Sequence, residues 1–198
     1  MKKGLFTLLI LCAVVKCFAQ GTGTGYSLPL PEKWKSETII FPIDFAPSIH
    51  YSGIEELRFT PGWGDAKSNE YWAYTFLWFV DGSPEVTTDT LNNHLTAYFN
   101  GLYRSNIKTK SATDNNSFTK VQIDKAATAS GDKQTYSGII STLNFLTGKP
   151  IAFFVMIHVQ NYPDAKSSAI FFELSPKPYN NPVWTKLDGI VQGFQLQK

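Results

Sequence analysis

The alternation of apolar and polar residues predicts a chain built mainly of β-strands. The clearest strand runs from Glu70 to Val80, and both of its faces are apolar. One face is aromatic throughout: Trp72, Tyr74, Phe76 and Trp78. The other face carries Tyr71, Ala73, Thr75, Leu77 and Phe79. Because a strand that is apolar on both faces must be covered twice, we expect it in the middle of a sheet.

Six further segments have strand patterns, at residues 38–42, 54–60, 118–123, 135–145, 151–160 and 168–174. The first ends at Pro42, which is typical of an edge strand. The segment at 151–160 is apolar on both faces, so it is expected to be central as well. Residues 146–150 contain Gly148 and Pro150 and are expected to join two of the strands as a hairpin.

Two amphipathic helices are predicted. The first is expected to begin with Ser83 as N-cap and Pro84 at N1, and its apolar stripe is Leu91, Leu95, Tyr98, Phe99, Leu102 and Tyr103. The second is expected to begin with Asn181 as cap and to bury Val183, Trp184, Leu187, Ile190, Val191 and Phe194. With one helix for each face of the sheet, the sequence predicts an α+β fold. Its sheet is expected to be largely antiparallel with six or seven strands, as an α/β/α sandwich.

The N-terminus has the pattern of an export signal. Lys2 and Lys3 precede an apolar run from Leu5 to Val15, and Ala19 stands at the expected cleavage position. This run is too short for a membrane span, and Lys16 before Cys17 argues against lipid anchoring. The expected organisation is a signal peptide at 1–19, a flexible Gly/Pro-rich tether at 20–34 and a single domain at 35–198.

Removal of the signal changes the charge and the cysteine content. Lys2, Lys3 and Lys16 would leave, which reduces Lys and Arg from 18 to 15 against 16 Asp and Glu. A mature domain with a net charge of −1 has no global field that would draw it to nucleic acid. Cys12 and Cys17 would leave too, so no disulfide is expected. These features favour an exported protein of the bacterial periplasm or extracellular space.

The three histidines do not form a metal motif, and neither a metal nor a cofactor is expected. His158 ends an apolar strand and is expected to be a hydrogen-bonded histidine near the core. His94 falls on the polar side of the first helix and is expected to be solvated. His50 is retained as a functional candidate because it precedes the strand at 54–60.

The polar residues of the segment Gly53–Gly82 supply the other candidates. Glu56 and Arg58 lie two apart on one strand face, where they form either a structural ion pair or a carboxylate-binding site. A hydrolase-type site could combine His50 with Glu55 or Glu56, or with Asp65. Trp63 lies in a Pro-Gly loop, where its ring could stack on a sugar. Arg58 and Trp63 are therefore the candidate ligand-binding residues.

The same segment carries a resemblance. The string FAP at 45–47, Gly53–Phe59 (GIEELRF), Pro61-Gly62 and Tyr71–Trp78 (YWAYTFLW) resemble an uncharacterised family of exported bacterial proteins. The layout, with Ile190, Val191 and Phe194 near its end, is more loosely similar to the PsbP/Mog1-like fold. That likeness implies an accessory or binding module rather than an enzyme.

The leading hypothesis is an exported non-catalytic domain that binds an unidentified protein or small-molecule ligand. The alternatives are the hydrolase that uses His50 and a carbohydrate-binding module that uses loop aromatics.

Overall fold

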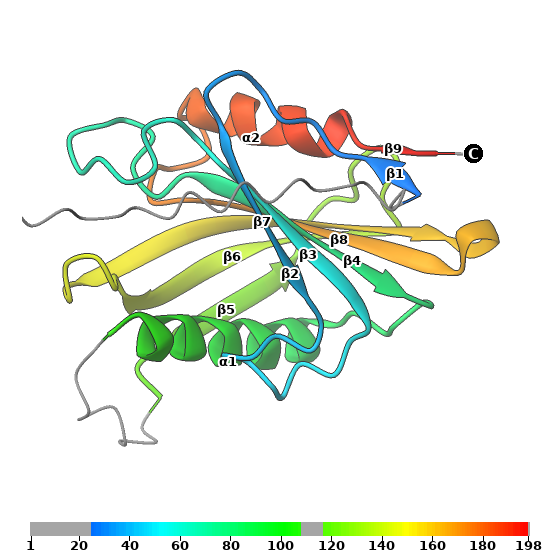
Figure 1. Ribbon diagram of the computed structural model, residues 1–198, viewed down its shortest axis with the longest axis horizontal. Coiled ribbons are helices and arrows are strands. Elements are labelled where there is room, and N and C mark those ends of the chain that lie inside the picture. Colours follow the sequence, from blue (N-terminus) through cyan, green and yellow to red (C-terminus); the bar gives the residue numbers. More distant parts are fainter. Residues whose placement is uncertain (1–24, 108–116, 198) are drawn as a thin grey trace, which may run out of the picture.

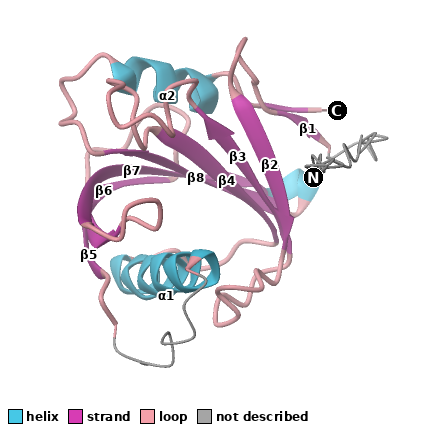
Figure 2. Ribbon diagram, turned by 60° about the vertical axis from the view of Figure 1, so that its left-hand side comes forward, coloured by secondary structure: helices cyan, strands magenta, loops and turns pink. Residues whose placement is uncertain are grey.

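The computed structural model describes residues 25–107 and 117–197. Its centre is an antiparallel sheet in the order β2-β3-β4-β8-β7-β6-β5. These strands are β2 (Lys35–Ile40), β3 (Gly53–Phe59), β4 (Tyr74–Asp81), β5 (Lys120–Lys125), β6 (Gln134–Leu143), β7 (Pro150–Tyr162) and β8 (Ser167–Ser175). Helix α1 (Thr88–Asn106) covers one face and helix α2 (Val183–Gln192) lies on the other (Figures 1 and 2). The predicted α+β class with a helix on each face is confirmed.

The centre of the sheet is buried on both sides, as the aromatic pattern predicted. On the α1 face, the Phe76 ring stacks on Phe172 at 4.4 Å between centroids and on Tyr98 at 5.3 Å. On the α2 face, Leu77 packs with Phe171 of the neighbouring strand. All nine residues of β8 are buried. The strands β4 and β8 are therefore covered on both faces, while the backbone of α1 lies nearest to β5 and β6.

The predicted start of the central strand at Glu70 was wrong, because residues 70–72 form turns and the strand begins at Tyr74. Trp72 has a φ of 54°, in the left-handed region. This break in the alternation brings Tyr71 and Trp72 to the same core cluster on the α1 face. The interpretation of Tyr71 as a residue of the opposite face is corrected accordingly.

The predicted start of α1 was also wrong. The N-cap is Thr87, not Ser83, and the helix begins at Thr88. The Thr87 hydroxyl accepts from the Thr90 amide at 3.2 Å, and the Thr90 hydroxyl accepts from the Thr87 amide at 2.8 Å. This reciprocal pair satisfies amides that a serine cap four residues earlier would leave open. The predicted stripe is confirmed through Leu91, Leu95, Tyr98 and Phe99, all buried.

Helix α2 agrees with the prediction in its buried stripe but not in its ends. The N-cap is Pro182, not Asn181, and Phe194 lies beyond the last helical residue, Gln192. The Asn181 side chain still accepts from the Val183 amide at 3.0 Å. The buried residues of the helix are Val183, Trp184, Leu187, Ile190 and Val191. The helix packs on β8 and β4. Phe154 and Met156 of β7 also pack against the cluster that contains Val183, Trp184 and Leu187.

The expected tether at 20–34 is packed against the domain from residue 25 onward. Strand β1 (Tyr26–Ser27) pairs with β9 (Gln195–Leu196), and Tyr26 is buried. The Arg58 guanidinium donates to the Pro29 carbonyl at 2.9 Å. The predicted signal at 1–19 lies outside the described residues. Within the described ranges, no helix is long and apolar enough to cross a membrane.

We expect Gly101→Ala to destabilise the protein although alanine is the better helix former. A Cβ at Gly101 would lie 1.7 Å from the Phe45 carbonyl oxygen, so helix and loop would have to separate. The cost expected from such overpacking is about 1–3 kcal/mol of unfolding free energy. Gly189→Ala in α2 is the matched control, because a Cβ there meets nothing within 4 Å. Its expected gain is up to about 1 kcal/mol. Urea unfolding measures both, and stabilisation by both substitutions would contradict the packing.

Candidate functional site

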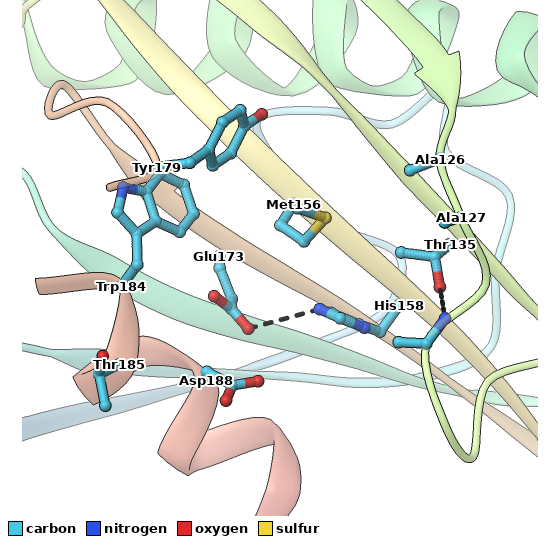
Figure 3. A pocket seen from close by; sticks show the side chains of 11 residues that line it. Ala126, Ala127, Thr135, Met156, His158, Glu173, Tyr179, Trp184, Thr185 and Asp188 are labelled. Atoms are coloured by element: carbon cyan, nitrogen blue, oxygen red, sulfur yellow. Dashed lines mark hydrogen bonds and ion pairs between the residues drawn. The ribbon is translucent and has the colours of Figure 1, made fainter. Parts of the chain in front are cut away.

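A cleft of about 490 Å³ opens on the α2 side of the sheet. Its floor is Thr135 of β6, Met156 and His158 of β7 and Glu173 of β8. Helix α2 forms one wall with Trp184 and Asp188, and the loop at 126–129 forms another (Figure 3). The cleft lies beside α2, which packs on β8 and β4 and whose buried residues cluster with Phe154 and Met156 of β7. We refer to it as the His158 cleft.

His158 lies between two carboxylates. Its Nδ1 is 2.7 Å from Asp132 Oδ2, and its Nε2 is 3.5 Å from Glu173 Oε1 (Figure 3 draws the second contact). The side chains of all three are less than 10% exposed, at 9% for His158, 1% for Asp132 and 3% for Glu173. The result is a charged cluster beneath an apolar rim.

Neighbouring side chains fix the position of Asp132. Its Oδ2 also accepts from the Thr135 hydroxyl at 2.6 Å, and its Oδ1 accepts from the Gln160 amide at 3.1 Å. The Thr135 hydroxyl in turn accepts from the Ala129 amide at 2.9 Å. These bonds tie the loop that walls the cleft to strands β6 and β7. A buried carboxylate with this many donors orients its histidine firmly.

The electrostatics of the cluster favour a protonated histidine. Burial lowers the pKa of His158, but the hydrogen bonds and charges of Asp132 and Glu173 outweigh burial and raise it to about 9. For Glu173, burial raises the pKa and the nearby His158 lowers it, with a net upward direction. Glu173 Oε1 has no hydrogen-bond donor with proper geometry among the described residues. Its one partner there is the His158 ring nitrogen, in the ion pair of 3.5 Å.

The protonation of His158 decides which roles it can take. An Asp–His pair can serve as a catalytic dyad, but a histidine whose pKa lies near 9 is already protonated at neutral pH and cannot accept a proton. The lining residues include no serine or cysteine, and the Thr135 hydroxyl already donates to Asp132. Over the described residues, no group of His, Cys, Asp and Glu is arranged to hold a metal ion.

The sequence anticipated His158 but not its partners. The prediction of a satisfied histidine near the core is confirmed. Asp132 lies in a polar loop whose position no periodicity could supply. Glu173 did leave a signal, since it is a lone charge inside the apolar run Ala169–Leu174. A charged side chain in a strand that is buried on both faces needs a partner of opposite charge or a hydrogen-bond donor, and His158 is that partner for Glu173.

Glu56 and Arg58 form the predicted ion pair, at 2.6 Å between Oε2 and Nη2. Glu56 also accepts from the Tyr26 hydroxyl at 3.1 Å. The Arg58 guanidinium donates further to the Pro29, Leu57 and Leu28 carbonyls. With these partners the guanidinium braces β3 and the N-terminal segment. Its role as a ligand-binding residue stays a prediction.

The remaining members of the hydrolase hypothesis are spread over the molecule. Glu55 and Glu56 lie on opposite faces of the sheet, because Glu55 accepts from Tyr98 of α1 at 2.8 Å. Asp65 lies on an exposed loop and accepts from the Lys67 amide. His50 is exposed, and no ion pair joins it to a carboxylate within the described part of the chain.

The exposure predicted for Trp63 and for His94 can be compared with the structure. Trp63 is half-buried, with its ring 5.0 Å from Phe59 and 4.9 Å from Trp72, both inclined rather than parallel. This is not the exposed, flat platform on which the carbohydrate hypothesis depends.

The expectation of a solvated His94 was wrong: it is half-buried and contacts the Tyr51 ring at 5.2 Å. Burial lowers the pKa of His94, and the charge of His50 adds to that effect.

Comparison with known proteins gives similarity in structure alone. No protein-family model and no curated sequence matches the chain. The solution structure of cyanobacterial PsbP from Synechocystis has a TM-score of 0.45 and 9% identity, and covers 89% of each chain. The crystal structure of LpqN, involved in cell envelope biogenesis of Mycobacterium tuberculosis, has a TM-score of 0.35 and 10% identity. It covers 87% of this chain and 83% of LpqN. Likeness at this level says nothing of ligand or activity.

The raised pKa of His158 makes stability depend on pH. The pKa of His158 is about 9 in the folded protein and about 6.5 in the unfolded chain. Its contribution to the free energy of unfolding is therefore complete below about pH 6.5 and is lost as the pH rises through about 9. The shift corresponds to at most about 3 kcal/mol of unfolding free energy. We therefore expect the gap in stability between wild type and His158→Asn to narrow from about pH 6.5 to about pH 10. Urea unfolding at several pH values measures the gap, and a constant gap over that range would contradict the charged pair.

Proposed function

We propose that this protein is an exported, non-catalytic binding domain that holds a small cationic molecule in the His158 cleft. Export rests on the signal pattern at 1–19. The binding role rests on one observation, which is the excess of carboxylates over cations around a concave, partly apolar site.

The charges of the cleft do not cancel. Glu173 and Asp188 line it, and Asp132 lies behind His158. Opposite them is one imidazolium, and no lysine or arginine is among the lining residues. Even with Glu173 protonated, Asp132 and Asp188 leave an excess negative charge. In a cleft with little water this excess acts on a ligand more strongly than it would at an open surface.

The aromatic wall fits the same class of ligand. The rings of Tyr179 and Trp184 are 4.8 Å apart between centroids. Both are held from behind, since the Trp184 indole donates to the Lys177 carbonyl at 3.0 Å and the Tyr179 hydroxyl donates to the Val155 carbonyl at 2.8 Å. Aromatic faces attract cations through the ring quadrupole, and fixed rings lose little entropy when a ligand binds.

A matched set of small probes tests this function. Benzyltrimethylammonium, benzyl alcohol and phenylacetate share an aromatic ring and differ in charge. We expect the cation to bind in isothermal titration calorimetry, the alcohol to bind more weakly, and the anion not to bind. Glu173→Gln keeps the shape and removes the carboxylate that a bound cation would hold in its ionised form. It is therefore expected to weaken binding of the cation by roughly tenfold or more, the scale of a charge-assisted contact.

The control is Asp164→Asn, which removes an exposed carboxylate that does not line the cleft. It is expected to bind the cation like wild type. Asp188→Asn, on the surface of α2, repeats the test without altering the buried cluster. The proposal would be refuted if the three probes bound with equal affinity. It would also be refuted if neither Glu173→Gln nor Asp188→Asn changed the affinity for the cation.

A further inference from the structure

A second cavity lies on the opposite face of the sheet, between α1 and strands β2–β4. Its volume is about 290 Å³, which is large for a gap beside a hydrophobic core. Aromatic rings from separate parts of the chain form most of its wall: Phe45, Phe59, Trp63, Trp72, Tyr74 and Phe145. We refer to it as the aromatic cavity. It shares no lining residue with the His158 cleft.

The cavity follows from the end of the apolar stripe of α1. Leu102 is the last stripe residue that lines it, and one turn later the helix presents Ser105 and Asn106. These two exposed polar residues mark the mouth. No apolar side chain of the helix therefore fills the space over β3 and β4, while the rings around it are held by contacts with one another, such as Trp72 with Phe145 at 5.0 Å.

The walls carry hydrogen-bond donors without acceptors. The indole nitrogens of Trp63 and Trp72 and the Tyr74 hydroxyl are buried and have no partner among the described residues. Trp72 and Tyr74 are each only 2% exposed. Buried donors in folded proteins are nearly always paired, so three in one wall indicate a place where an acceptor is needed.

Charge narrows the class of ligand. Glu37 of the edge strand β2 is the one charged residue among those that line the cavity. A carboxylate there disfavours an anion, and the unpaired donors on the walls disfavour a cation. An uncharged molecule with an oxygen acceptor meets both conditions.

We propose that the aromatic cavity is a second ligand site, which takes a small, uncharged aromatic molecule that carries a carbonyl oxygen. The rings of the wall pack on the apolar body, and the unpaired N–H of the lining residue Trp63 is the donor for the carbonyl. This site is independent of the cation site, because the two open on different faces of the sheet.

The probe is Prodan, an uncharged naphthalene with a propionyl carbonyl whose emission responds to polarity and hydrogen bonding. Its companion, 2-dimethylaminonaphthalene, lacks the carbonyl. We expect Prodan to bind one-to-one with a saturable change in emission, and the companion to bind more weakly. Trp63→Phe keeps a ring and removes the N–H, so it is expected to weaken Prodan roughly three- to tenfold and to leave the companion unchanged.

Substitutions at exposed positions of α1 test whether Prodan binds in the aromatic cavity. Ser105→Trp adds a bulky ring at the mouth, where the residue is exposed and folding is not at risk. We expect it to abolish Prodan binding. Asn93→Trp, also exposed on α1 but not lining the cavity, is the matched control and is expected to bind like wild type. The absence of a saturable signal up to the solubility of Prodan would overturn the proposal, as would equal binding by the two tryptophan variants.

Discussion

The rest of the structure depends on the burial of β4 and β8 from both sides. Their residues pack against α1 on one face and against α2 on the other, so neither helix can leave without exposing aromatic area. A single short helix cannot cover seven strands, however. Helix α2 packs on β8 and β4 and clusters with Phe154 and Met156 of β7, and the His158 cleft lies beside it.

Three buried or half-buried glutamates show how differently one fold can accommodate an acid. Glu56 stays beside a guanidinium that is itself bound to backbone carbonyls. Glu55 has no cation, and burial raises its pKa to about 8 against the opposing hydrogen bonds of Tyr98 and Trp78, so it is largely uncharged at neutral pH. Glu173 shares a histidine with Asp132, through an ion pair of 3.5 Å that lacks hydrogen-bond geometry. Glu55 Oε2 and Glu173 Oε1 both lack a hydrogen-bond partner among the described residues, but of the three glutamates only Glu173 lines the cleft. This contrast is why the Glu173 cluster is the better functional candidate.

Local pattern predicted much of the fold. The strand at β4, the hairpin of β6 and β7, and the buried stripes of both helices follow from periodicity, because burial on a sheet or helix repeats at a fixed interval. The failures have other causes. Helix α1 begins where the hydroxyls of Thr87 and Thr90 cap it, and not at Ser83-Pro84, which also has the pattern of a helix start. The sites were largely hidden, since Asp132 reaches His158 from a loop and the aromatic cavity combines rings that are far apart in sequence. The Glu56–Arg58 pair, which is two residues apart, was the part of the candidate chemistry that sequence could place.

The pairing of β1 with β9 brings together residues from the two ends of the described chain. Tyr26 lies opposite Leu196, and the Gln197 amide donates to the Gly25 carbonyl at 2.8 Å. Residues 25 and 197 are therefore held side by side. A short linker between these neighbours would join them without crossing the sheet, and new ends could be opened in the exposed turn at 146–148. The same packed core is thus expected to form from a circularly permuted chain, in which the strands follow one another in a different order along the sequence.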